Sequence, residues 1–212
     1  MLTKDVWARN VRKNSNMVKN PGFEETFGKK TLPKYWYLTC AGVNDNPDSV
    51  YCGTSHKGLH SAHLWSDADT GEVHLHYSLA IPVKTGNCYS LMGFVKTDSI
   101  KGFAQVTAVF LDSAKTVRSK ILPQTFTATN SWQEFYMDAR APEKAAFAAI
   151  TCELHGIGHV YFDDIYFSAF KNIAHPKADK NILPGMRPDI FVLTGIIILI
   201  AGGLFVFKIK RK

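Results

Sequence analysis

Apolar and polar residues alternate in short stretches along most of the chain, and this spacing predicts strands rather than amphipathic helices. The stretches are rich in β-branched and aromatic residues, and Gly, Pro, Asn and Asp separate them, as is typical of turns between strands. Strands are expected at residues 73–83, 88–96, 104–111, 117–121, 132–139, 145–154 and 159–168. Regular short strands of this kind predict an all-β fold, with an antiparallel β-sandwich domain over residues 17–170.

Two adjacent carboxylates interrupt the last predicted strand. Because side chains alternate across a strand, Asp163 lies on one face and Asp164 on the other, so one of them points toward the core. A buried carboxylate without a partner costs several kcal/mol. A cation held by oxygen ligands, most simply Ca²⁺, would stabilise it. The alternative is a carboxylate pair at the edge of the sheet without metal.

The pattern changes near the C-terminus. Prolines in residues 171–189 favour an extended stalk, and residues 190–207 are an uncharged, mostly apolar run with no polar face. A helix of that length spans ~27 Å, close to the ~30 Å hydrocarbon core, so one C-terminal transmembrane helix is predicted. The basic tail at residues 208–212 places the C-terminus in the cytoplasm and the domain outside the cell, as in a single-pass membrane protein.

Residues 1–16 form a polar N-terminal segment without the apolar stretch of a signal peptide. Export therefore requires a signal upstream of this sequence, and the alternative is a tail-anchored protein whose domain faces the cytosol. The basic tail and the cysteines favour export. Cys40, Cys52, Cys88 and Cys152 are even in number and widely spaced, which predicts two disulfides outside the cell. Buried thiols are the alternative for Cys88 and Cys152.

The net charge of +7 comes from the ends of the chain, because residues 17–170 carry thirteen basic and fifteen acidic side chains. The body therefore has no basic face for phosphates, which argues against a nucleic-acid partner. The sequence also lacks the G-x-S-x-G, H-E-x-x-H and phosphate-loop motifs, and the adjacent carboxylates cannot face each other across a substrate. We expect no enzyme activity.

Several short motifs occur in a fixed order along residues 17–168. They are Asn20-Pro21-Gly22-Phe23-Glu24, a tryptophan soon after Pro33, a glycine turn at residues 56–62, residues 81–89, Ser131-Trp132-Gln133 and Tyr161-Phe162-Asp163-Asp164-Ile165. Their order and spacing resemble the carbohydrate-binding modules with the galactose-binding-like jelly-roll fold, the group that contains families four, nine, sixteen and twenty-two. The resemblance implies a jelly-roll β-sandwich that binds glycan, with Trp36 and Trp132 in its core.

The same resemblance implies a structural Ca²⁺ ion. Its ligands would be Glu24, the backbone carbonyl of Lys57 and Asp163, with Asp164 or Glu25 as substitutes. An ion there would neutralise the inward carboxylate and tie the two ends of the domain together. Carboxylates that are hydrogen-bonded without metal are the alternative.

Sugar recognition needs flat aromatic faces and polar groups that bond to hydroxyls. Aromatic residues in or beside loops are candidate platforms. The outward side chains of the strand that begins near residue 73, together with those of a neighbouring strand, are candidate hydroxyl-binding groups. The expected ligand-binding residues are therefore Trp65, Tyr37, Tyr51, His74, His76 and Gln105, with Thr107 beside the last.

The histidines also allow a competing site. His74 and His76 point the same way from one strand, and His56, His60 and His63 lie nearby in the sequence. A borderline transition metal such as Zn²⁺ or Cu²⁺ suits such ligands. Histidines that face solvent or hydrogen-bond within the fold are the alternative.

The sequence thus predicts a membrane-anchored, non-catalytic glycan-binding module at the cell surface. Its partners would be a glycan or cell-surface polysaccharide and, through residues 190–207, the membrane. The alternative is a structural or accessory subunit of a membrane or cell-surface assembly, which uses the sandwich for contacts with protein subunits.

Overall fold

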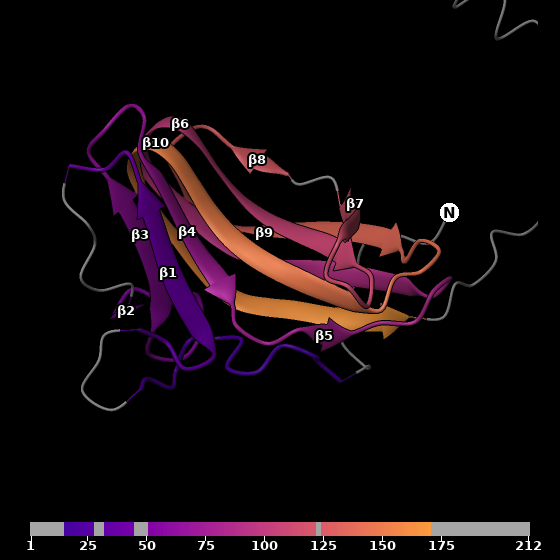
Figure 1. Ribbon diagram of the computed structural model, residues 1–212. Helices are drawn as coiled ribbons and strands as arrows, with labels where there is room; N and C mark the ends of the chain where they lie inside the picture. The colour runs from indigo at the N-terminus through magenta and orange to yellow at the C-terminus, as the bar shows by residue number, and fades with distance from the viewer. Residues whose placement is uncertain (1–14, 28–31, 45–50, 122–123, 171–212) are drawn as a thin grey trace, which may run out of the picture. The chain divides into compact units, whose positions relative to one another are not determined.

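The computed structural model describes residues 15–27, 32–44, 51–121 and 124–170, which form strands joined by turns (Figure 1). All strand pairs are antiparallel, and no helix occurs within these ranges. The strands are β1 (Trp36–Ala41), β2 (Tyr51–Cys52), β3 (Ser61–Ser66), β4 (Glu72–Tyr77), β5 (Ile81–Pro82), β6 (Cys88–Leu111), β7 (Val117–Ile121), β8 (Thr125–Phe126), β9 (Asn130–Arg140) and β10 (Phe147–Phe170).

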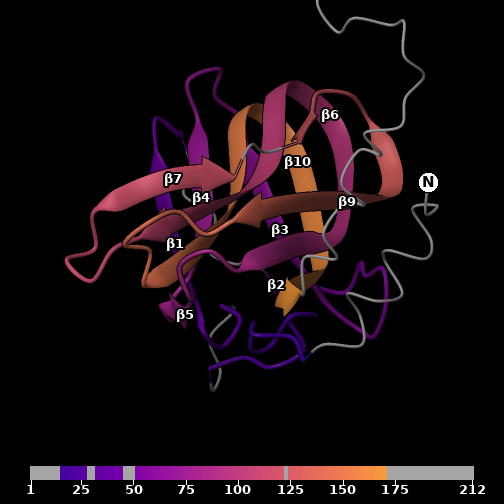
Figure 2. The same cartoon turned by 90° about the vertical axis from the view of Figure 1, so that its right-hand side faces the viewer.

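Two long strands, β6 and β10, connect the layers of the sandwich. Each has 24 residues, and the two pair with each other from end to end. Figure 2 shows them arching together, so that each strand passes from one sheet into the other. The first sheet has the order β1–β4–β10–β6, with β5, β7 and β8 at its margins, and the second has the order β2–β3–β10–β6–β9.

Glycines mark the bend between the two sheets. Gly102 pairs with Gly156, and their φ angles are +124° and +89°. A β-carbon at Gly102 would lie 2.1 Å from the carbonyl oxygen of His155, and one at Gly156 would lie 2.2 Å from that of Lys101. The two backbones therefore approach more closely here than any side chain allows.

The core lies between the sheets and takes every second side chain of each strand. On β4, Val73, Leu75 and Tyr77 are buried, whereas the residues between them face outward. Trp36 is buried as well, and its ring centroid lies 5.0 Å from that of Phe23 and 5.2 Å from that of Tyr77. The prediction that Trp36 belongs to the core is confirmed.

Trp132 departs from its prediction. The inward side chains of β9 are Phe135 and Met137, so Trp132 has the opposite parity and faces outward. It is only partly buried, and its ring meets His56 edge-on at a centroid distance of 5.9 Å. The prediction that Trp132 packs in the core was wrong, because the local alternation on β9 decides which face each residue takes.

The predicted strands agree with the structure in position but not in continuity. β7 has the predicted bounds. The strands expected on either side of residues 97–103 are one strand, β6, and those on either side of residues 155–158 are one strand, β10. Glycines in both segments predicted turns, whereas the structure uses them to bend continuous strands. The strand expected at residues 73–83 is two strands, β4 and β5, and β1, β2 and β8 were not predicted.

The cysteines are thiols where the structure describes their side chains. Cys40, Cys88 and Cys152 are free, and the last two are buried. The structure therefore does not support the two predicted disulfides, and Cys88 and Cys152 follow the alternative of buried thiols.

The predicted membrane segment cannot be compared with the structure. Residues 1–14 and 171–212 lie outside the described residues, so the stalk, the transmembrane helix at 190–207 and the basic tail stay predictions. Within the part that is described, no helix is long and apolar enough to cross a bilayer.

We expect Gly156→Ala to destabilise the protein more than Gly86→Ala. Both glycines have positive φ, but a β-carbon at Gly86 meets nothing within 4 Å. Gly86→Ala should therefore cost about 1–2 kcal/mol from backbone strain alone. Gly156→Ala should cost roughly 1–3 kcal/mol more, because the two long strands must separate. Urea unfolding of the full chain measures both, and equal losses would show that the close approach at the bend is not required.

Candidate functional site

The outer side of the first sheet carries three rows of side chains, which we call the polar face. In each row the register places one residue from each of β1, β4, β10 and β6 side by side, and directly opposed residues share a face. The rows are Tyr37–His76–Thr151–Thr107, Thr39–His74–Glu153–Gln105 and Ala41–Glu72–His155–Phe103. Four of the predicted ligand-binding residues therefore lie on one side of the sheet, namely Tyr37, His74, His76 and Gln105, although Gln105 is buried there.

The first row presents an aromatic ring to solvent. Tyr37 is 48% exposed, and its ring stacks on His76 at a centroid distance of 4.8 Å and an interplanar angle of 23°. Both ring nitrogens of His76 have hydroxyl partners, Nε2 with Thr39 Oγ1 at 2.8 Å and Nδ1 with Thr151 Oγ1 at 3.0 Å. Burial, and then the neighbouring His74, lowers the pKa of His76. The row is thus a fixed, neutral platform.

The second row is built around a nearly buried carboxylate. Glu153 is 8% exposed, and its Oε2 accepts a hydrogen bond from Gln105 Nε2 at 2.5 Å and lies 3.1 Å from His155 Nε2. Burial raises the pKa of Glu153, but the hydrogen bonds with Gln105 and His155 outweigh it and hold the pKa below its usual value. Glu153 is therefore ionised at neutral pH.

The third row and His74 gather three potential metal ligands. Glu72, His74 and His155 each offer one ligand atom, and these atoms lie within 4.8 Å of one another. The competing metal prediction paired His74 with His76, but both nitrogens of His76 are already engaged. His155 was missed, because only the pairing of β10 with β4 brings it next to Glu72.

Trp65, another predicted platform, lies on a different surface. It is on β3, opposite His159 of β10, in the second sheet. His63 is beside it and stacks on Tyr161 at a centroid distance of 4.5 Å and on His159 at 5.3 Å. Tyr51 falls in β2, and its side chain lies outside the described part. The predicted ligand set thus divides between the two sheets.

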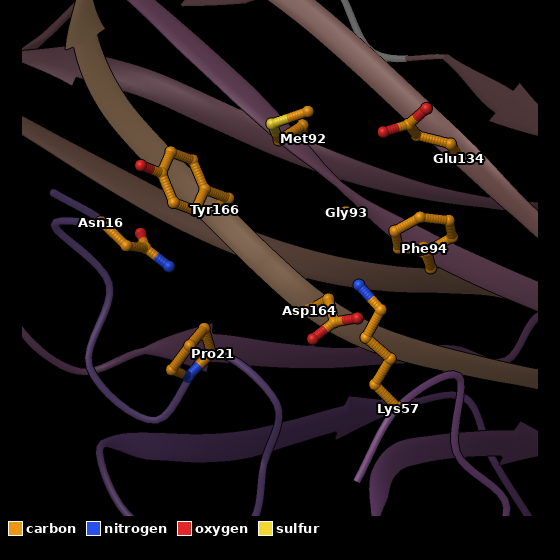
Figure 3. Close-up of a pocket in the computed structure, with 9 residues that line it drawn as sticks. All are labelled: Asn16, Pro21, Lys57, Met92, Gly93, Phe94, Glu134, Asp164 and Tyr166. Atoms are coloured by element: carbon orange, nitrogen blue, oxygen red, sulfur yellow. The ribbon is translucent and has the colours of Figure 1, made fainter. Parts of the chain in front are cut away.

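The second sheet also has a pocket on its outer side, with a cavity volume of about 230 Å³. Figure 3 shows Asp164 of β10 beside Lys57 of the glycine turn, with Phe94 near Lys57 and Tyr166 of β10 on the other side of Asp164. The remaining lining residues are Asn16, Pro21, Met92, Gly93 and Glu134. The sequence did not predict this pocket, because it forms only where the turn at residues 20–24, which we call the opening turn, packs beside β10, the closing strand.

The opening turn and the closing strand bind the same glycine turn, at residues 56–62. Asp163 is fully buried, and its Oδ2 accepts hydrogen bonds from the backbone N–H groups of His56 (2.8 Å) and Lys57 (3.1 Å). Glu24 Oε1 accepts one from the N–H of Leu59 at 2.8 Å. Burial raises the pKa of Asp163 to about 6, although these backbone hydrogen bonds act in the opposite direction.

Hydrogen-bond donors face these carboxylates. Asp164 Oδ2 lies 2.8 Å from His56 Nδ1, and Glu24 Oε2 lies 3.1 Å from His60 Nδ1. Ca²⁺ binds through oxygen ligands, whereas oxygens of Glu24, Asp163 and Asp164 are here engaged by backbone N–H groups and histidine rings. Within the described residues, Glu24, Asp163 and Asp164 are not among the ligand groups that converge within 4.8 Å. The contacts match the alternative without metal, and calcium stays a prediction.

Glu25, the other substitute ligand, points elsewhere. Its Oε2 pairs with Lys34 Nζ at 3.2 Å in an exposed position. Glu25 therefore serves as a matched control for the buried carboxylate.

We expect Asp163→Ala to lower the free energy of unfolding by about 2–4 kcal/mol, because backbone N–H groups of the glycine turn would be left buried without acceptors. Glu25→Ala should change it by less than about 1 kcal/mol, as for an exposed ion pair. Urea unfolding measures both changes. If the two variants were equally stable, Asp163 would not be what holds the turn.

Added Ca²⁺ tests the metal. The hydrogen bonds described here predict that Ca²⁺, added to the chelator-treated chain, leaves its melting temperature as it was. A melting temperature that rises with Ca²⁺, in the unchanged chain but not in Asp163→Asn, would instead support the predicted calcium ion.

The position of His63 in the second sheet predicts that the stability of the protein falls in acid. Burial, and then the neighbouring His159, lowers the pKa of His63 to about 4, below its usual 6.5. The folded state thus favours the neutral ring, so stability is complete above the usual pKa and is lost as the pH falls toward the folded value. When the pH is lowered from about 7 to about 5, we expect the melting temperature of the His63→Phe variant to fall less than that of the unchanged chain. Equal losses would contradict this role.

Comparison with known proteins shows which folds this chain resembles. No protein-family model and no curated protein sequence matches the chain. Among solved structures, the enzymatically active domain of tailspike protein 4 from bacteriophage CBA120 is 13% identical with a TM-score of 0.58, over 73% of this chain and 21% of that one. The CBM22-1 xylan-binding domain of Paenibacillus barcinonensis Xyn10C is 10% identical with a TM-score of 0.50, and the match covers 74% of this chain and 96% of that one. A structure described as CBM4 is 20% identical with a TM-score of 0.49, and the match covers 72% of this chain and 99% of that one.

The chain thus spans about a fifth of the length of the tailspike structure and nearly all of the xylan-binding domain. At these identities the likeness concerns the fold alone. The described part of the chain is an all-β sandwich that resembles the jelly-roll carbohydrate-binding modules, which confirms the predicted fold at that level.

Proposed function

We propose that this protein binds a glycan without catalysis, and that the polar face is the binding surface. The observation that carries the proposal is the exposed Tyr37 ring, which stacks on a His76 that two hydroxyls hold in place. The sandwich likeness to a xylan-binding domain supports the same class of ligand.

A pyranose ring has one face of C–H groups and a rim of hydroxyls. An exposed aromatic ring covers the first, and planar polar groups bond to the second. On the polar face, Tyr37 supplies the ring. Polar groups follow in the same and the next row, including the hydroxyls of Thr39 and Thr151. Gln105 supports the second row from a buried position, where its amide N–H donates to Glu153. Because the rows cross four strands, the face offers positions for successive sugar units.

The polar face is a better candidate than the pocket of the second sheet. That pocket has a volume of about 230 Å³, and two carboxylates and one lysine line it. It suits a small polar ligand more than an oligosaccharide, since ligand sites commonly occupy about 300–1,000 Å³. A variant in the second sheet therefore provides a control for the polar face.

The proposal does not include hydrolysis. Glycosidases need one carboxylic acid with a raised pKa opposite a second carboxylate. On the polar face, hydrogen bonds lower the pKa of Glu153, which is the wrong direction for a general acid. Asp163 and Asp164 are bound to the glycine turn in the second sheet.

We further propose, from the sequence, that residues 190–207 anchor the domain at a membrane with the domain outside the cell. The basic tail at residues 208–212 supports this orientation. The free thiols of Cys40, Cys88 and Cys152 remove the disulfide argument for export. The orientation therefore depends on the tail alone.

We expect Tyr37→Ala to weaken glycan binding by about ten-fold or more, equivalent to roughly 1.4 kcal/mol, because the ring that covers the sugar is lost. Tyr37→Phe should retain most of the affinity, since it keeps the stacked ring. Trp65→Ala, on the other sheet, should bind as the unchanged chain does. Affinity electrophoresis against a polysaccharide panel that includes xylan measures all three.

Two outcomes would contradict this assignment. Loss of binding in Trp65→Ala but not in Tyr37→Ala would move the site to the second sheet. No binding on a broad panel, with the protein co-purifying in a stoichiometric membrane complex, would favour the accessory-subunit alternative.

A further inference from the structure

A second kind of site lies at the end of the polar face. Glu72 and His74 are two residues apart on β4 and point the same way, and His155 lies directly opposite Glu72 on β10. One ligand atom from each lies within 4.8 Å of the others, and His155 Nδ1 is 3.8 Å from Glu72 Oε1. Ligands of a tetrahedral Zn²⁺ ion, at about 2.0–2.2 Å from the metal, lie ~3.3–3.6 Å apart. Small side-chain rotations would close this set around an ion.

The His155 ring is already oriented as in a metal ligand. Its Nε2 is 3.1 Å from Glu153 Oε2, and an ionised carboxylate can only accept, so Nε2 carries the proton. In the neutral ring Nδ1 then has the free lone pair, on the side of Glu72. Gln105 Nε2 donates a hydrogen bond to Glu153 Oε2 at 2.5 Å, and the Phe103 ring stacks on the His155 ring at a centroid distance of 4.4 Å. A carboxylate behind a histidine is the usual outer partner of a metal-binding imidazole.

His74 has an unused nitrogen. Its Nε2 is buried and has no hydrogen-bond partner in the described part of the chain. The His74 ring lies 5.1 Å from that of His155, between centroids. A buried nitrogen without a partner costs free energy, and a bound ion would give it one.

The donor set selects the class of ion. Two imidazoles and one carboxylate suit a borderline divalent transition metal, whereas Ca²⁺ and Mg²⁺ prefer oxygen ligands. We propose that Glu72, His74 and His155 bind one divalent transition-metal ion of the Zn²⁺ class, with Glu153 as the group that positions His155. Three protein ligands leave a fourth position for water or a ligand atom. This site does not depend on whether the polar face binds glycan.

The test uses the full chain, stripped with a chelator and desalted, and Zn²⁺ as the probe. Competition with a chromophoric chelator gives the affinity and stoichiometry, and Co²⁺ absorption reports the geometry. We expect one site per chain with tetrahedral Co²⁺ bands. His74→Ala and Glu72→Gln should each weaken Zn²⁺ binding by about ten-fold or more, and Glu153→Gln should weaken it by roughly ten-fold.

Two histidine variants separate this site from general histidine binding. His63→Ala, in the second sheet, should keep the Zn²⁺ affinity of the unchanged chain. His76→Ala should also keep it, because the His76 nitrogens are bound to Thr39 and Thr151. Melting temperatures of all variants with chelator present verify folding, and Glu72→Gln changes only an exposed side chain.

The proposal is overturned if the unchanged chain binds no stoichiometric Zn²⁺. It is also overturned if His63→Ala or His76→Ala loses as much affinity as His74→Ala, or if Glu72→Gln and His74→Ala both fold and bind Zn²⁺ unchanged. In those cases the three residues are a hydrogen-bonded and ion-paired cluster without metal.

Discussion

The antiparallel pairing of β6 with β10 is the constraint on which the rest of the structure depends. These strands bend together where Gly102 faces Gly156, so each contributes one half to either sheet. β4 then pairs with one half of β10, and β3 pairs with the other. Because the side-chain period of a strand is two, this register alone decides which residues share an outer face. It places the polar face on one sheet and the Trp65 surface on the other.

A second constraint acts where the ends of the domain meet. β10 changes register after Asp163, and Asp164 takes a positive φ of 51°. The irregularity lets the two adjacent carboxylates reach different parts of the same glycine turn, one by backbone N–H groups and the other by His56. Burial of Asp163 is costly, and the ring of donors around it offsets that cost. The pocket of the second sheet lies beside this junction, so its shape depends on the same hydrogen bonds.

The sequence predicts those features that depend on local alternation. The strand composition and the outward side of His74 and His76 follow from periodicity. The meeting of the turn at residues 20–24 with β10 follows from the motif order that the resemblance rests on. Features that depend on register between distant strands do not follow. Glu153 lies near the end of a predicted strand and His155 just beyond it, and only their pairing with β4 and β6 makes them part of a site. Trp65 and Tyr37 both read as exposed aromatics, and no local signal shows that they lie on different sheets. The glycines near residues 102 and 156 predict turns, because a bend in a continuous pair of strands has the same local composition.

The central claim is that this register assembles one ligand-binding face from β1, β4, β10 and β6. Chemical-shift mapping of the isotope-labelled chain, during titration with the oligosaccharide selected by the polysaccharide panel, tests it most directly. The account predicts that the perturbed backbone amides gather at residues 37–39, 74–76, 105–107 and 151–155, where the rows of the polar face lie. Perturbations that gather instead around Trp65 or around the pocket at Asp164 would contradict it.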